Sequence, residues 1–219
     1  MPIPTDAAFI LPDDFADAAL MGRVFRPDFA GPAVVTVRTD GVFDITDTYP
    51  TASQLAATAD PAAALRAAQG QRLGSLQDVL TNTPTDNRDP TRPWLLAPID
   101  LQVINAAGVT FAISMLERVI EERARGNPDS AAAIRAEVTQ ENHQYPDGFV
   151  LFLGTAFAPI QDRSAKGQGL THVEGDLVTI ATPRLGRLVN RMRKSGDCER
   201  WEFGLTALIT ALTRRRKAA

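Results

Sequence analysis

The chain has 219 residues, of which 44% are hydrophobic and 22% are charged, and its formal net charge at pH 7 is −3. This slightly acidic balance excludes a strongly basic nucleic-acid binder, and no segment approaches the roughly 20 apolar residues that a membrane span needs. Because the N-terminus lacks a basic start and a long apolar core, we expect no signal peptide, no membrane association and a cytoplasmic location.

The N-terminal part predicts a small α/β domain. Over residues 22–45 the runs "AVVTV" and "VFDI" flank an Asp40-Gly41 turn, which is typical of a β-hairpin. Short helices are expected after Pro50, one of them beginning at Asp60 and another lying in "SLQDVL".

The domain boundary is predicted from a polar, proline-rich stretch. Residues 81–93, "TNTPTDNRDPTRP", contain three prolines and almost no apolar side chains. We therefore expect an N-terminal domain over 1–80, a linker over 81–93, and a second domain over 94–219.

The second domain shows helical patterns first and strand patterns after them. The run "AISMLERVIEERARG" has apolar residues at helical spacing, and another helix is expected through about residue 140. The stretch "EGDLVTIATPRLGRLVNRMR" predicts antiparallel β-structure, and "WEFGLTALITALTRRR" predicts a terminal amphipathic helix. For its basic end, 214–217, a solvated helix terminus is favoured over a binding patch because cations stabilise that end of the helix dipole.

Two groups of polar residues are candidates for a site. Ser114 and Glu117 share a helix face with Thr110 just upstream, an arrangement that suits either acid–base chemistry or an ordinary solvated first turn. Thr155 ends the apolar run "FVLFLG", where it either binds a carboxylate or only terminates a strand.

The polar loop over 159–172 follows that run. Gln161 and Arg163 lie in it, and Arg163 suits a carboxylate clamp, although a surface excursion is the plainer interpretation. His143, His172 and Cys198 alone do not make a four-ligand zinc site. The residues by themselves indicate a cytosolic α/β protein with a candidate site for a small acid.

Three blocks of the chain resemble the fumarylacetoacetate hydrolase superfamily, in particular its 2-keto-3-deoxy-sugar-acid dehydratases. They are "LLAPIDLQVINAAGVTFAISMLERVIEERARG", "HQYPDGFVLFLGTAFAPIQDR" and "GQGLTHVEGDLVTIATPRLGRLVNRMR". The stretch "GRVFRPDFAGPAVVTVRTDGVFDIT" is similar to the small N-terminal domain of that branch. The resemblance implies an α+β fold with a mixed β-roll core in the second domain, and a small 2-keto acid as substrate.

The resemblance also implies roles for single residues. The family pattern "NYxxHAxE" falls on residues 110–117, where Glu117 matches the family's glutamate and Ser114 stands in place of its histidine. Thr155 matches a family threonine that contacts the substrate acid, and Gln161 and Arg163 lie in the loop that closes the site. Because the missing histidine helps to activate water, an acylpyruvate-type C–C hydrolase is less expected than a dehydratase.

The family's metal-binding segment has no counterpart in this sequence. Members hold Mg²⁺ or Mn²⁺ with an "ExE" pair and a later aspartate, all lying between the first two blocks, but here "IRAEVTQEN" runs directly into "HQYPDGF". We assign no metal ligand and expect an incomplete core with a seam near 138–142. Strands that have lost their neighbours leave open edges, so we also expect self-association into a homo-oligomer.

Two functional hypotheses follow from this resemblance. The first is a metal-dependent 2-keto-3-deoxy-pentonate dehydratase, forming 2,5-dioxopentanoate, that is impaired by the internal deletion. The second is a non-catalytic remnant that acts as an oligomerisation partner of a full-length paralogue.

Overall fold

The computed structural model describes residues 2–106, 120, 123, 145–152, 162–163, 165–167, 169–170 and 172–218. These residues fall into two compact units: the first contains 1–100 and 172–219, and the second contains 101–171. Helices and strands occur in separate segments, as the predicted α+β class requires. The domain boundaries at 80 and 93 remain a prediction.

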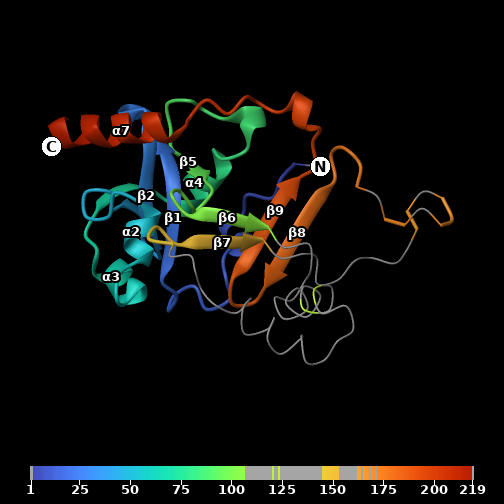
Figure 1. The fold of residues 1–219 in the computed structure, drawn as a ribbon, viewed down its shortest axis with the longest axis horizontal. Helices are drawn as coiled ribbons and strands as arrows, with labels where there is room; N and C mark the ends of the chain where they lie inside the picture. The colour runs from blue at the N-terminus through green and yellow to red at the C-terminus, as the bar shows by residue number, and fades with distance from the viewer. Residues whose placement is uncertain are drawn as a thin grey trace. The chain divides into compact units, whose positions relative to one another are not determined.

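A five-stranded antiparallel sheet organises the first unit (Figure 1). Its strands lie in the order β4-β3-β2-β1-β5, and their bounds are β1 Leu20–Arg26, β2 Gly31–Arg38, β3 Gly41–Asp44, β4 Gln71–Gly74 and β5 Trp94–Leu96. The predicted hairpin is confirmed, because Arg38 pairs with Gly41 across the β2–β3 turn. Gly41 has φ +146°, a backbone conformation that side chains other than glycine's rarely adopt.

Short helices cover both faces of this sheet. They are α2 Ala52–Ala56, α3 Pro61–Ala67 and α4 Leu76–Thr81, whereas α1 Ala7–Ile10 contacts α4. On one face Leu55 of α2 and Leu65 of α3 pack against Val34, and on the other Val79 of α4 packs against Val35. The predicted helix start is confirmed, because the Asp60 side chain accepts a hydrogen bond from the N–H of Ala63 at 2.9 Å.

The polar stretch after α4 forms a loop closed by one side chain. The amide nitrogen of the buried Asn82 donates to the carbonyls of Asp89, Arg92 and Pro93 at 3.0–3.1 Å, and its oxygen accepts from the Asp89 N–H at 2.7 Å. A short 3-10 helix, η2, spans Thr85–Asn87 within this loop. Asn82 therefore supplies the hydrogen bonds that this non-repetitive backbone lacks.

We expect Asn82→Ala to lower the free energy of unfolding by about 1–2 kcal/mol, because it removes the amide that satisfies several backbone groups at once. Chemical denaturation of the purified protein measures this effect. Gln69→Ala is the matched control, because the exposed Gln69 side chain makes one weak hydrogen bond of 3.4 Å. Equal losses in both variants would contradict the role assigned to Asn82.

A second hairpin and a terminal helix complete the first unit. Strands β8 Leu177–Thr182 and β9 Gly186–Arg191 pair antiparallel, as predicted for this stretch. The hairpin contacts the N-terminal segment, where the Asp13 N–H donates to the Pro183 carbonyl at 2.8 Å. The helix α7 spans Leu205–Ala218 and confirms the predicted terminal helix. Two further 3-10 helices are η1 Pro27–Phe29 and η3 Ser195–Asp197.

The described part of the second unit contains one parallel strand pair. β6 Val103–Ala106 pairs with β7 Phe149–Phe152, from Val103 opposite Phe149 to Ala106 opposite Phe152. The predicted helices over 111–125 and up to 140 and the seam near 138–142 lie outside the described residues, except that Ile120 and Arg123 are helical. Within the described residues, every helix is too short or too polar to cross a lipid bilayer.

Candidate functional site

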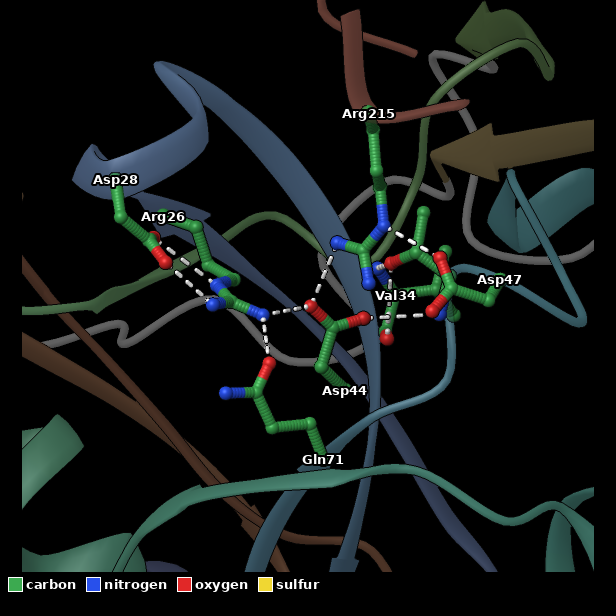
Figure 2. Close-up of polar contacts among 8 residues, drawn as sticks. Arg26, Asp28, Val34, Asp44, Asp47, Gln71 and Arg215 are labelled. Carbon is green, nitrogen blue, oxygen red and sulfur yellow. Dashed lines mark hydrogen bonds and ion pairs between the residues drawn. The ribbon is translucent and has the colours of Figure 1, made fainter. Parts of the chain in front are cut away.

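A buried charge cluster lies where α7 meets the sheet (Figure 2). Asp44, only 3% exposed, ends β3, and its Oδ2 accepts from Arg26 of β1 at 2.7 Å and from Arg215 of α7 at 2.8 Å. Its other oxygen accepts from the Thr46 N–H at 2.9 Å. One carboxylate thus joins two strands and the terminal helix.

Three more side chains at the edge of the cluster accept hydrogen bonds from the two arginines. Arg26 also forms a two-pronged pair with Asp28 and donates to Gln71 Oε1 at 2.9 Å. Arg215 donates through Nε to Asp47 at 2.7 Å. Figure 2 shows both guanidinium groups directed at Asp44, that of Arg26 from the left and that of Arg215 from above. Each buried charge in the cluster therefore has a hydrogen-bonded partner of opposite sign, and none is isolated.

The cluster's electrostatics exclude an acid–base role for Asp44. Burial raises the pKa of Asp44, but hydrogen bonds from Arg215, Thr46 and Arg26 lower it more, so the pKa lies below its ordinary value. Burial lowers the pKa of Arg215, and its hydrogen bonds to Asp47 and Asp44 raise it above the ordinary value. Asp44 stays ionised and fully occupied by donors. The arrangement therefore stabilises the docked helix instead of binding substrate.

A second buried carboxylate has a similar structural role. Asp100, at the end of the first unit's N-terminal part, accepts from the N–H groups of Ala52 and Ser53 at 2.6 and 3.1 Å and from Ser53 Oγ at 2.8 Å. Arg23 lies 3.6 Å away and adds a positive charge. Asp100 therefore completes the N-terminus of α2, where helix N–H groups need an acceptor.

Five of the six residues predicted for the site lie outside the described residues: Thr110, Ser114, Glu117, Thr155 and Gln161. Only Arg163 is described. It is exposed, and its backbone N–H donates to the Gly169 carbonyl at 3.2 Å. The neighbouring Asp162 accepts from the N–H groups of Gly167 and Gly169 at 2.8 and 2.7 Å. These contacts fold the loop around Arg163 back on itself.

The described part of the chain contains no ligand set for the Mg²⁺ or Mn²⁺ that the resemblance implies. Mg²⁺ or Mn²⁺ requires several converging oxygen ligands, and no group of three His, Cys, Asp or Glu side chains among the described residues could hold an ion. Asp44 is not a candidate metal ligand either, because its Oδ2 accepts hydrogen bonds from two arginines. We therefore assign no chemical step to a metal.

Sequence reasoning missed the role of Arg215. The prediction of a solvated basic helix end is wrong for this residue, which is buried, whereas Arg214, Arg216 and Lys217 are exposed. A local signal existed, since Arg215 lies four residues after Ala211 and seven after Leu208, the two apolar residues that α7 buries. That spacing places the arginine on the buried face.

The fold defines an α+β protein. No protein-family model matches the chain, and neither a curated protein nor a solved structure does.

Proposed function

We propose that the chain is a fumarylacetoacetate hydrolase-superfamily protein of the 2-keto-3-deoxy-pentonate dehydratase type, with an incomplete β-roll core and weak or absent turnover. Three sequence blocks and the N-terminal hairpin support the family. The parallel pairing of β6 with β7 is the observation that carries the proposal furthest, because it joins the first two of these blocks in space.

Parallel pairing puts the carboxyl ends of both strands at one edge. β6 ends at Ala106 and β7 at Phe152, opposite each other in the register. One group of candidates, Thr110 to Glu117, follows β6 in the sequence, and the other, Thr155 to Arg163, follows β7. Ligand sites of parallel sheets are found beyond such carboxyl ends. This supports one shared site for the two groups.

In the proposed site Glu117 takes part in proton transfer, and Thr155 and Arg163 hold the substrate carboxylate. Dehydration removes a proton from C3, next to the 2-keto group, and releases a hydroxyl group as water after it gains a proton. Loss of the C4 hydroxyl leaves a C3=C4 double bond beside the 2-keto group. Moving a proton from C5 to C3 then gives the C5 enol, which tautomerises to the aldehyde of 2,5-dioxopentanoate. A water nucleophile is not needed, which agrees with Ser114 in place of the family's histidine.

We expect the purified protein to bind 2-keto-3-deoxy-pentonate but to release little or no 2,5-dioxopentanoate with Mg²⁺ present. Calorimetric titration measures binding, and product formation measures turnover. Arg163→Met should weaken binding about tenfold, the usual loss for a charge-assisted hydrogen bond. Lys166→Met is the matched control, because it removes the same charge from an exposed position of the same loop.

The outcomes separate the parts of this proposal. Efficient Mg²⁺-dependent turnover would show that the core is functionally complete and would overturn the expected impairment. Equal weakening in the two variants would mean that Arg163 contributes only its charge and does not clamp the carboxylate. If neither the protein nor its variants bind the 2-keto acid, the dehydratase-type site itself is wrong.

A second candidate, a non-catalytic partner of a full-length paralogue, is favoured by the exposure of the same strand pair. Val103, Ile104, Phe149 and Phe152 are exposed large apolar residues, although parallel strands are normally covered on both faces. Within the described residues, no third strand pairs with β6 or β7. Co-purification with a paralogue, combined with no binding of the 2-keto acid, would support this candidate.

A further inference from the structure

The terminal helix α7 has a wider apolar face than the sheet covers. Leu208, Ala211 and Arg215 are buried, and Ala211 packs against Gly31 of β2. Leu205 and Ile209, on the adjoining side of the helix, are 62% and 57% exposed. An apolar helix face normally packs against another element. Part of this face is therefore open.

Along the helix the open face continues at helical spacing, because Leu212 and the exposed Arg216 follow Ile209. Trp201, in the non-helical segment just before α7, is 89% exposed. We call these five residues the outer stripe: Trp201, Leu205, Ile209, Leu212 and Arg216. A tryptophan this exposed is uncommon in a monomer's surface and is typical of interfaces.

The two ends of the outer stripe carry opposite charges. Asp197, Glu199 and Glu202, with Arg200 among them, precede the helix, whereas Arg216 and Lys217 lie in its last turn and Arg214 just before it. In the part of the chain that the structure describes, neither Glu202 nor Arg216 forms an ion pair. The surface is therefore acidic at one end, apolar in the middle and basic at the other end.

We propose that α7 pairs antiparallel with α7 of a second copy of this chain through the outer stripe. An antiparallel two-fold arrangement is self-complementary: Leu205 of each copy meets Leu212 of the other, and Ile209 lies near the axis. Glu202 then lies close to Arg216 of the second copy, and Trp201 is within reach of the same guanidinium. A parallel pair would instead bring like charges together.

The size of this surface suits a modest dimer. Covering both stripes and their charged ends removes on the order of 1,000 Å² from water, the lower limit for a specific interface. The proposal does not depend on the dehydratase assignment. It also names a different surface from the open strands β6 and β7, so the two routes to self-association are separable.

The first test measures the dimer dissociation constant by analytical ultracentrifugation. Leu205→Glu and Ile209→Glu should each weaken dimerisation about a hundredfold, because each buries an unpaired carboxylate inside the apolar part of the contact. Thr210→Glu is the matched control, since Thr210 is exposed on α7 outside the outer stripe. Thermal unfolding checks that each variant remains folded.

The second test exchanges charges between copies. Glu202→Arg and Arg216→Glu should each weaken the dimer when studied alone, because each places like charges opposite each other twice. An equimolar mixture of the two variants should recover the wild-type dissociation constant, since both contacts become attractive in the mixed dimer. This recovery requires an antiparallel contact between different copies, and it needs no knowledge of a substrate.

Three results would overturn the proposal: a monomeric wild-type protein, a dimer that Ile209→Glu leaves intact, or a mixture that shows no recovery. A dimer lost on Leu151→Glu in β7 but retained in the α7 variants would assign self-association to the strand pair instead.

Discussion

Asp44→Asn is expected to lower the free energy of unfolding by about 3–5 kcal/mol, the cost of removing one partner from a buried ion pair. The substitution keeps the shape of the side chain but leaves the buried Arg26 and Arg215 facing a neutral amide. Because α7 is held through Arg215, the helix should also become less protected. Denaturant unfolding measures the stability, and amide hydrogen exchange over 205–218 measures the release of the helix.

The control for this prediction is Asp47→Asn. Asp47 pairs with the same arginine, but its side chain is 73% exposed, so its loss should cost less than about 1 kcal/mol. Comparable losses in the two variants would mean that the buried position of Asp44 has no special importance.

The effect of Asp44→Asn depends on pH in a definite direction. The folded state holds the pKa of Asp44 below its ordinary value, so the unfolded chain takes up this proton first as the pH falls. The stabilisation is complete above the ordinary carboxyl pKa of about 4 and is lost as the pH falls through the lower pKa of the folded state. The stability difference between the wild type and Asp44→Asn should therefore narrow in acid. A difference that widens there would contradict the ionised role of Asp44.

Local chemistry explains which parts of the fold are predictable from the sequence. The β2–β3 hairpin follows from the Asp40-Gly41 turn between two apolar runs, and α3 begins at Pro61, where the Asp60 side chain accepts from the Ala63 N–H. Each of these features is determined by residues that are neighbours in the chain. The same applies to the β8–β9 hairpin and to the existence of α7.

Features that join distant residues were not predictable in this way. Asp44 and Arg215 are 171 positions apart, and no local pattern indicates that an acidic strand end will receive an arginine from the last helix. The β6–β7 pair shows the same difficulty, because two short, largely apolar strands identify neither their partner nor its direction. Of the predicted site, the structure describes only Arg163, so the roles of Glu117 and Thr155 stay predictions.

Gly31→Val should lower the free energy of unfolding by about 3 kcal/mol, the upper part of the usual range for overpacking. A Cβ atom at position 31 would lie 2.5 Å from the Cβ of Ala211, so α7 would have to move away from β2. Gly22→Ala is the matched control in the neighbouring strand, because its Cβ would meet only a methyl group of Val35 at 3.3 Å. Urea denaturation of both variants measures the difference.

The cause of this loss can be tested by its coupling to the charge cluster. If Gly31→Val moves α7, then Arg215 also moves away from Asp44, and the two substitutions share part of their cost. The double variant Gly31→Val/Asp44→Asn should therefore lose clearly less stability than the two single losses combined. Ala211→Gly should restore much of the stability of Gly31→Val, because it removes the opposing methyl group. Full additivity would show that the close contact at Gly31 and the Asp44 cluster hold α7 independently. Failure of Ala211→Gly to rescue would show that the Ala211 methyl group does not cause the loss.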